Sequence, residues 1–299
     1  MTNNERILVI GATGNIGKKL VQELTDRKVA TTIYVRNPIK AKDLFGSVSD
    51  DYLTVVQGDF DDLTPLKEAL PGHTRLFLLV PAFNGLPRNK KNIASLAYEA
   101  GVEQIVDLSS LGASLPSRTI FLGREHQLAE DAILELAHHH SSDKRRTVVN
   151  LRPGRFTSNL LAYDRPTQNE FIGLVDAQVP QTWISPNDIA IVAANILTDD
   201  IDKHGDAVYE LLGDAVTGAQ TAEILTRVLG RPYTYKQISA WEKYQLASQS
   251  GMIPHRIIYD LITISDSSFK VTPGLTVLLN GNAPETLEAY ITANAHLLQ

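Results

Sequence analysis

The stretch Ile7-Leu8-Val9-Ile10-Gly11-Ala12-Thr13-Gly14-Asn15-Ile16-Gly17 decides the fold of this chain. A short apolar run breaks into three glycines spaced by three residues, and residues 18–24 then place apolar side chains at helical spacing. This order predicts a strand, a tight turn and a helix, with one glycine for the turn, one for the approach of a bound group and one for helix–strand packing. The free N–H groups of such a helix start suit a pyrophosphate, so the expected phosphate-binding residues are Gly11, Thr13, Gly14, Asn15, Ile16 and Gly17.

The composition is that of an ordinary globular protein. Of the 299 residues, 43% are apolar and 21% are charged. The formal net charge of −6 argues against a nucleic-acid partner, and the basic clusters Lys90–Lys91 and Lys144–Arg146 are expected to be solvated. The absence of cysteine excludes disulfides and thiolate chemistry. No signal-peptide core and no apolar run of about 18 residues occurs, so we expect a soluble cytoplasmic protein that binds no membrane.

Strands and helices alternate along the first half of the chain. Apolar, β-branched segments at 30–35, 52–57, 75–80, 104–108 and 147–151 are separated by helical patterns, with no hairpin signal between them. This pattern predicts an α/β fold, a Rossmann-type doubly wound parallel sheet. The rhythm changes after Asn159, which predicts a dinucleotide-binding domain over residues 1–159, completed by about 183–213, and a smaller C-terminal α+β substrate lobe over 160–182 and 214–299.

Arg36 stands at the position that selects the cofactor in dinucleotide-binding folds. An acidic residue about 20 positions after the glycines bonds the ribose hydroxyls of NAD, whereas an arginine there accommodates the 2′-phosphate of NADP. Here Arg36 follows the second strand, Lys40 and Lys42 come next, and no acid occurs before Asp43. The sequence therefore predicts NADP(H), the alternative being that Arg36 is a solvated surface residue.

Asp59 and Phe60 follow the third strand, at the edge of the sheet where ligands of parallel sheets bind. A carboxylate and an aromatic ring at this place can bond the adenine amino group and cover its ring. Asp61 or Asp62 suits the cap of the helix that follows, so only Asp59 and Phe60 are taken as adenine contacts.

The fourth and fifth strands end in residues that suit a ligand cleft. Val80, Pro81, Ala82 and Phe83 follow the nearly all-apolar fourth strand and are expected to line the cofactor or substrate cleft. Ser109–Ser110 follow the fifth strand, where their hydroxyls can bond a nicotinamide or a substrate, or can merely terminate the strand.

The histidines give no metal signal. His126 and Glu130 stand four residues apart on one helix and share a face, but no further ligands accompany them. Consecutive residues of a helix point in different directions, so the run His138–His140 is expected to be a solvated helix end. We therefore predict no metal site.

Several blocks of the chain together resemble the NmrA-like branch of the atypical short-chain dehydrogenase/reductases over residues 6 to about 240. The blocks are Gly11 to Gly17, Val35-Arg36-Asn37-Pro38, Gly58-Asp59-Phe60, Ser109 to Ala113, His126 to Glu130, Leu151 to Phe156, Trp183 to Ala190 and Tyr209 to Gly213. The resemblance implies a Rossmann domain with a small C-terminal substrate lobe, a preference for NADP(H), and a family that mixes reductases with cofactor-sensing regulators. It also implies that Pro153, Gly154 and Phe156 lie by the nicotinamide and that His126 approaches the nicotinamide ribose.

The chain departs from the wider superfamily at the catalytic helix. The Tyr-x-x-x-Lys of typical members is absent, because the segment from Phe121 to His126 contains neither residue. Reduction of a ketone creates an alkoxide that a nearby acid should protonate, whereas an iminium ion, a quinone or a conjugated acceptor is already electrophilic and needs chiefly orientation. The catalytic candidates are His126, as ribose ligand or proton donor, and Ser110, although His126 also suits a structural role in the core.

These observations favour an NADP(H)-dependent reductase of a hydrophobic small molecule, in specialised metabolism. The candidate substrate contacts are Phe83, Phe156, Asn159, Trp183 and Trp241, although each aromatic residue also suits a core position. Two alternatives stay open. One is an NADP(H)-bound enzyme that steers a cyclisation with no net redox change, and the other is a non-catalytic NADP(H) sensor that binds a protein partner.

Overall fold

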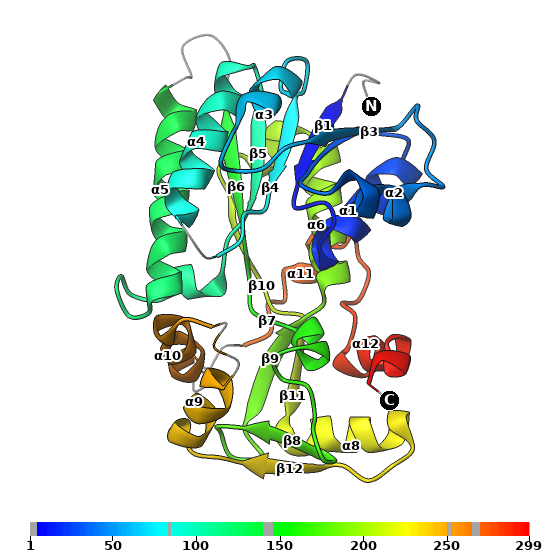
Figure 1. Ribbon diagram of the computed structural model, residues 1–299, viewed down its shortest axis with the longest axis vertical. Helices are drawn as coiled ribbons and strands as arrows, with labels where there is room; N and C mark the ends of the chain where they lie inside the picture. The colour runs from blue at the N-terminus through cyan, green and yellow to red at the C-terminus, as the bar shows by residue number, and fades with distance from the viewer. Residues whose placement is uncertain are drawn as a thin grey trace.

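A seven-stranded, all-parallel sheet forms the larger part of the molecule (Figure 1). The computed structural model describes residues 5–82, 85–139, 146–249, 251, 253–264 and 270–298. The strand order is β10-β6-β5-β4-β1-β2-β3. The strands are β1 (Arg6–Ile10), β2 (Ala30–Val35), β3 (Leu53–Gln57), β4 (Arg75–Leu78), β5 (Gln104–Leu108), β6 (Thr147–Pro153) and β10 (Val208–Leu211). The direction of winding reverses between β1 and β4, so the prediction of a doubly wound Rossmann sheet is confirmed.

Helices cover both faces of this sheet (Figure 1). On one face α1 (Asn15–Asp26) packs along α6 (Pro186–Thr198), beside α2 (Pro38–Phe45). On the other face α4 (Leu86–Glu99) packs along α5 (Phe121–His139), beside α3 (Thr64–Ala69). None of the helices among the described residues combines the length and the apolarity that a bilayer span requires.

A smaller part of the molecule lies beyond the carboxyl end of β6 (Figure 1). It contains two small sheets, of order β11-β9-β7 and β12-β8, around a core of its own that includes Phe171, Trp183 and Leu225. Its strands are β7 (Arg155–Phe156), β8 (Glu170–Gly173), β9 (Pro180–Ile184), β11 (Asp214–Thr217) and β12 (Thr234–Gln237). Its helices include α8 (Gly218–Leu229), α9 (Ala240–Ser248), α10 (His255–Ile264) and α12 (Leu287–Ala293). The chain returns from this part to add β10 to the large sheet, and the domain limits given above stay a prediction.

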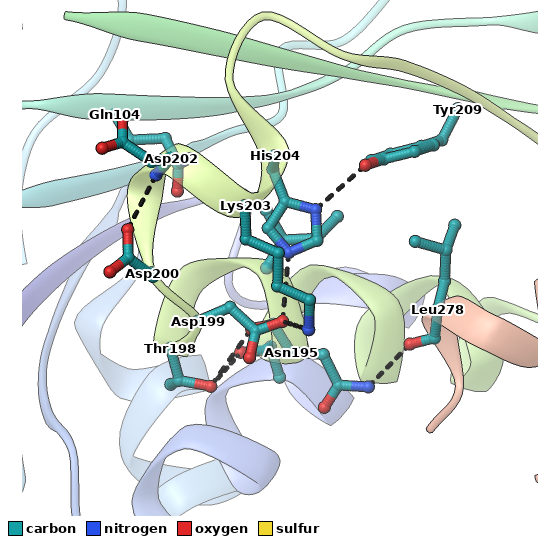
Figure 2. A network of polar contacts seen from close by, with 12 residues as sticks. Gln104, Asn195, Thr198, Asp199, Asp200, Asp202, Lys203, His204, Tyr209 and Leu278 are labelled. Atoms are coloured by element: carbon teal, nitrogen blue, oxygen red, sulfur yellow. Dashed lines mark hydrogen bonds and ion pairs between the residues drawn. The ribbon is translucent and has the colours of Figure 1, made fainter. Parts of the chain in front are cut away.

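A network of hydrogen bonds and ion pairs connects the edge strand β10 to the end of α6 (Figure 2). Within it, Asp199 Oδ2 lies 2.6 Å from Lys203 Nζ and 3.0 Å from His204 Nε2, and His204 Nδ1 lies 3.0 Å from the Tyr209 hydroxyl. Lys203 and His204 belong to the short helix α7 (Ile201–His204). Arg75, the first residue of β4, donates to the carbonyl oxygen of Asp199 at 3.0 Å. The network therefore lies at the amino ends of the strands, away from the glycine turn.

One carboxylate joins the two parts of the molecule. Asp260 of α10 is 2% exposed and accepts hydrogen bonds from the first two N–H groups of α5, from Phe121 at 3.0 Å and from Leu122 at 2.6 Å. Arg256 lies over the Phe121 ring, 4.3 Å from its centroid. A residue far along the chain thus caps α5, since the first N–H groups of a helix have no partner inside it.

We expect Asp260→Ala to lower the free energy of unfolding by about 2 kcal/mol, because it leaves two half-buried N–H groups without an acceptor. Urea denaturation followed by circular dichroism measures this loss. Asp131→Ala, an exposed change on the same helix, is the control and should leave the midpoint unchanged. Equal midpoints for both variants would contradict the assigned cap.

A second buried carboxylate ties α6 to the segment before α12. Asp188 is 4% exposed and accepts a hydrogen bond from the Glu285 N–H at 2.8 Å, while the Ser185 hydroxyl donates to the Glu285 carboxylate. Burial, together with the facing charge of Glu285, raises the pKa of Asp188 to about 6. An acid with a raised pKa binds its proton more tightly in the folded than in the unfolded chain, so stability falls as the pH rises through this interval.

Asp188→Asn should therefore stabilise the protein at pH 8 and not at pH 4. Between these two values we expect the difference in unfolding free energy between variant and parent to grow by about 1–3 kcal/mol, since asparagine keeps the acceptor and carries no charge to bury. Urea unfolding at both pH values measures it, with Asp43→Asn on the exposed side of α2 as the control. A difference that does not depend on pH would exclude an elevated pKa for Asp188.

Candidate functional site

The glycine turn after β1 is built by close backbone packing. Gly11 has φ +84°, and a Cβ on it would lie 2.9 Å from Leu79 Cβ. A Cβ on Gly17 would lie 2.1 Å from the Gly11 carbonyl oxygen, so the start of α1 rests directly on the turn. Gly14 is the N-cap of α1 and is exposed, as is Asn15. Since glycine has no side chain to cap a helix, the first N–H groups of α1 have no side-chain acceptor and can seat an anion.

Arg36 stands beside this turn, directly after the last residue of β2. Its side chain is exposed, and no hydrogen bond or ion pair to any described residue engages the guanidinium. The next residue, Asn37, caps α2 by accepting the N–H groups of Ile39 and Lys40. The structure therefore leaves the Arg36 guanidinium available to an anion from outside.

The turn after β3 uses Asp59 to hold its own backbone. Asp59 is exposed, and its Oδ1 accepts the N–H groups of Asp61 at 2.9 Å and Asp62 at 3.2 Å. Asp62 in turn accepts the N–H of Thr64 at the start of α3. Phe60 is half-buried against the core beneath α3 and α4. The Asp59 carboxylate thus shapes this turn, and its predicted contact with adenine stays a prediction.

The segment after β4 lies at the same edge of the sheet as the glycine turn. Val80 is buried, Ala82 half-buried and Pro81 exposed, while Phe83 lies outside the described residues. The strand ends at Leu78, two residues earlier than predicted, because the chain turns where Leu79 packs against Gly11.

A polar cluster occupies the ends of β5 and β6. The Ser109 hydroxyl donates to Glu130 of α5, and Arg152 of β6 forms an ion pair with the same carboxylate. Ser109 and Glu130 are both buried. Ser110 is half-buried, and its Oγ accepts the Gly112 N–H at 3.1 Å, which begins the 3₁₀ turn η1 (Leu111–Ser114). Ser109 is therefore occupied within the protein, whereas Ser110 keeps its hydroxyl hydrogen for another acceptor.

His126 lies in the second turn of α5 and is 6% exposed. Its Nδ1 is buried and finds no hydrogen-bond partner among the described residues. Burial, helped by the charge of Lys90, lowers the pKa of His126 well below its usual value of 6.5. The ring is therefore a neutral imidazole at physiological pH, with a buried nitrogen that no described residue engages.

Lys90 corrects a prediction made from the sequence. It was expected to lie on a solvated face with Lys91, yet its side chain is 0% exposed. Its Nζ lies 2.7 Å from Oδ1 of Asp107, which is itself 0% exposed, and donates to the Leu108 carbonyl oxygen at 2.8 Å. Asp107 was the overlooked signal, because a single carboxylate in the apolar strand Gln104–Leu108 requires a partner.

The residues after β6 lead into the smaller part of the molecule. Pro153 is buried, and a Cβ on Gly154 would lie 2.3 Å from Leu212 Cδ2, so the backbone is closely packed here. Phe156 and Asn159 are half-buried. Phe156 packs against the core on the α1 and α6 face. These predicted contacts begin with Pro153, the last residue of β6, and so lie at the edge of the sheet where the glycine turn lies.

The two tryptophans differ from each other in their surroundings. Trp183 is 1% exposed within the core of the smaller part, and the Arg155 guanidinium lies 4.1 Å above its ring. This position favours a structural role over the predicted substrate contact. Trp241 of α9 is 65% exposed and stacks on Tyr244, with 5.5 Å between ring centroids.

Potential metal ligands do not gather within the described part of the chain, where no three His, Cys, Asp or Glu side chains form a group. His138 lies 3.1 Å from Asp206 Oδ2 and His139 lies 3.9 Å from Glu135, each at the exposed end of α5, while His140 lies outside the described residues.

Known proteins resemble this chain over most of its length. It is 29% identical over 250 residues to an NAD(P)H azoreductase of Xenophilus azovorans, with 82% of each chain covered. It is also 29% identical over 236 residues to a (4-alkanoyl-5-oxo-2,5-dihydrofuran-3-yl)methyl phosphate reductase of Streptomyces griseus, with 78% of this chain and 77% of the relative covered. The solved NADPH complex of an NADPH-dependent quinone oxidoreductase from Escherichia coli superposes with a TM-score of 0.78 at 26% identity, over 97% of this chain and 99% of that one.

The profile of the NmrA-like family matches residues 3–272. The match includes the glycine turn, Arg36, the buried ion pair and the helix that carries His126, which together make up the site described above. The resemblance inferred from the sequence blocks is confirmed, and the chain belongs to the NmrA-like family.

Proposed function

We propose that this protein is an NADP(H)-dependent reductase that delivers hydride to a hydrophobic small molecule already polarised for attack, such as a quinone, an enone or an iminium ion. Its relatives include reductases that are named for NAD(P)H or NADPH and for small-molecule acceptors, among them the azoreductase and the quinone oxidoreductase. The coarser conclusion is that the protein is an NAD(P)-dependent oxidoreductase of small molecules. The preference for NADP(H) and the class of acceptor are argued below from its own residues.

The residues at the glycine turn fit a phosphorylated dinucleotide. The N–H groups at the start of α1 are open, and a side chain at Gly17 would collide with the turn. Arg36 is exposed beside them and unengaged by the described residues. Arginine presents a planar fork of donors that matches a phosphate, which supports a role in holding the 2′-phosphate of NADP(H).

One observation carries the choice of acceptor. On α5, where an acid would be expected, the structure offers the buried, neutral imidazole of His126. When bound, NADPH would supply a hydride and become NADP⁺; a quinone or an enone then takes one proton from solvent, whereas an iminium ion becomes a neutral amine and takes none. A neutral imidazole is a poor acid, so an acceptor that needs protonation as hydride arrives suits this site badly.

The remaining residues are proposed to bind and orient. We propose that His126 hydrogen-bonds the nicotinamide ribose, and Ser110 keeps a hydroxyl hydrogen for the cofactor or the acceptor. Ala82 and Phe156, both half-buried, offer apolar surface at the same edge of the sheet. Such a surface excludes water and favours a hydrophobic acceptor.

A substrate panel tests the function directly. With NADPH in excess, we expect the purified protein to oxidise NADPH in the presence of a quinone, an enone and a cyclic iminium ion, and not in the presence of a matched saturated ketone. The loss of nicotinamide absorbance measures turnover. Tight NADPH binding with silence across the whole panel would overturn the reductase in favour of a cofactor sensor, and turnover of the ketone would overturn the proposed acceptor class.

Arg36→Ala should weaken NADPH binding by about 10- to 100-fold, since it removes a charge-assisted contact that is typically worth about 1.5–3 kcal/mol. Isothermal titration calorimetry measures the dissociation constants. NADH binding should be unchanged, because NADH lacks the 2′-phosphate. Arg27→Ala, which removes an arginine paired with Glu23 at the far end of α1, is the matched control. Unaltered NADPH affinity in Arg36→Ala would exclude the proposed preference.

A further inference from the structure

The 3₁₀ turn η1 packs directly against the backbone of α5. A Cβ on Gly123 of α5 would lie 2.2 Å from the Gly112 carbonyl oxygen, so helix and turn touch with no side chain between them at this point. Leu111, Gly112 and Ala113 are all buried. The position of η1 is therefore set by its contacts with the helix.

Gln127, one helical turn after Gly123, holds the same turn by its carbonyl groups. Its Nε2 donates to the carbonyl oxygens of Ala113 and Leu115, each at 2.9 Å. In a continuing 3₁₀ turn the Ala113 carbonyl would accept the N–H of the third residue after it, but that residue is Pro116, which has no N–H. The amide of Gln127 therefore supplies a donor that the local backbone lacks.

A second attachment of η1 runs through Ser114. Its hydroxyl accepts a hydrogen bond from Arg152 Nη1 at 3.2 Å and donates to the Glu210 carboxylate. Both contacts are exposed, so water can replace them, whereas Gln127 is half-buried. Gln127 is thus the attachment that solvent replaces less readily.

Ser110 stands at the start of η1, two residues after the end of β5. Its Oγ accepts the Gly112 N–H at 3.1 Å, and its carbonyl oxygen accepts the Ala113 N–H at 2.9 Å. None of the described residues accepts its hydroxyl hydrogen, and ligands of parallel sheets bind at this edge. The place of the Gly112 N–H, and hence of η1, restricts the direction in which Ser110 can donate.

We propose that Gln127 is a positioning residue, which fixes η1 so that the Ser110 hydroxyl donates to the carbonyl oxygen of the acceptor. This inference rests on the proposed function, and it favours a quinone or an enone over an iminium ion, which has no such oxygen. As hydride and its electron pair reach the conjugated system, the carbonyl oxygen gains negative charge, and a donor already aimed at it stabilises that charge. Ser110 keeps its hydrogen throughout, and the oxygen takes its proton from solvent.

The hold of Gln127 on Ser110 can be tested without cofactor or turnover. The chain has no cysteine, so Ser110→Cys introduces a single thiol, and the rate of its alkylation by N-ethylmaleimide reports how firmly this position is held. We expect Gln127→Met to raise that rate at least about 3-fold, because a released turn exposes the thiol more often. Gln22→Met, which removes an exposed hydrogen bond on α1, is the control and should leave the rate unchanged.

Equal alkylation rates with and without Gln127 would overturn the proposal. A faster rate that matches an equal loss of global stability in urea would also overturn it, since unfolding would then expose the thiol. Methionine keeps the volume and the helix propensity of glutamine. Gln127→Asn, whose amide is one carbon shorter and cannot reach both carbonyl groups, is the second variant and should behave alike.

The effect on the reaction is tested in the protein with its native Ser110. Gln127→Met should lower kcat for a quinone by about 3- to 10-fold, the range expected for the loss of one hydrogen bond, and leave NADPH affinity and iminium reduction unchanged. Ser110→Ala should have a similar effect, and the double variant should lose no more, because both changes remove the same hydrogen bond.

Multiplicative losses in the double variant, or an equal loss with the iminium ion, would overturn the proposal. Weaker NADPH binding in either variant would place the hydroxyl on the cofactor and would overturn it as well. A substrate panel without any turnover contradicts the proposed function, whereas equal alkylation rates contradict the hold of Gln127 on Ser110, so the two failures are distinguishable.

Discussion

The contact between Gly17 and the Gly11 carbonyl oxygen is the constraint on which the rest of the structure depends. The backbone of α1 approaches the turn so closely that even one added carbon would lie 2.1 Å from that oxygen. The approach aligns α1 with the carboxyl end of β1 and leaves its N–H groups open beside Arg36. It also fixes the side of the sheet on which a ligand can bind, because all seven strands run parallel and end at the same edge.

The other side of the site is assembled from contacts between distant segments. The helix that carries His126 is capped by Asp260, more than a hundred residues further along the chain, and Glu130 on the same helix holds Ser109 and Arg152. The first turn of α5 is thus held by the smaller part of the molecule and its next turns by the sheet. Asp260 thereby links α10 of the smaller part to the start of the helix that carries His126.

The features that could be predicted from the sequence are those whose physical cause is local. The glycine spacing predicts the turn, because the positive φ of Gly11 and the approach of Gly17 to the Gly11 carbonyl oxygen arise within the turn itself. The alternation of apolar strands with amphipathic helices predicts a parallel sheet, and this prediction of the fold is confirmed. The place of Arg36 directly after β2 could also be predicted, because the β-branched run from Ala30 to Val35 marks the strand, and its contact with the 2′-phosphate stays a prediction.

Features that depend on a distant partner could not be read in this way. Lys90 was predicted to be solvated with Lys91, but the fold places Asp107 against it. Trp183 suited a pocket wall or a core position by sequence, and it lies in the core of the smaller part. The sequence by itself determined the nucleotide-binding turn, the Rossmann sheet and the missing Tyr-x-x-x-Lys, because these are set by residue type and by short-range spacing. Only the tertiary structure decided which ionisable groups are buried and paired, because the charge of a side chain such as His126 depends on the solvent and the partners that packing leaves around it.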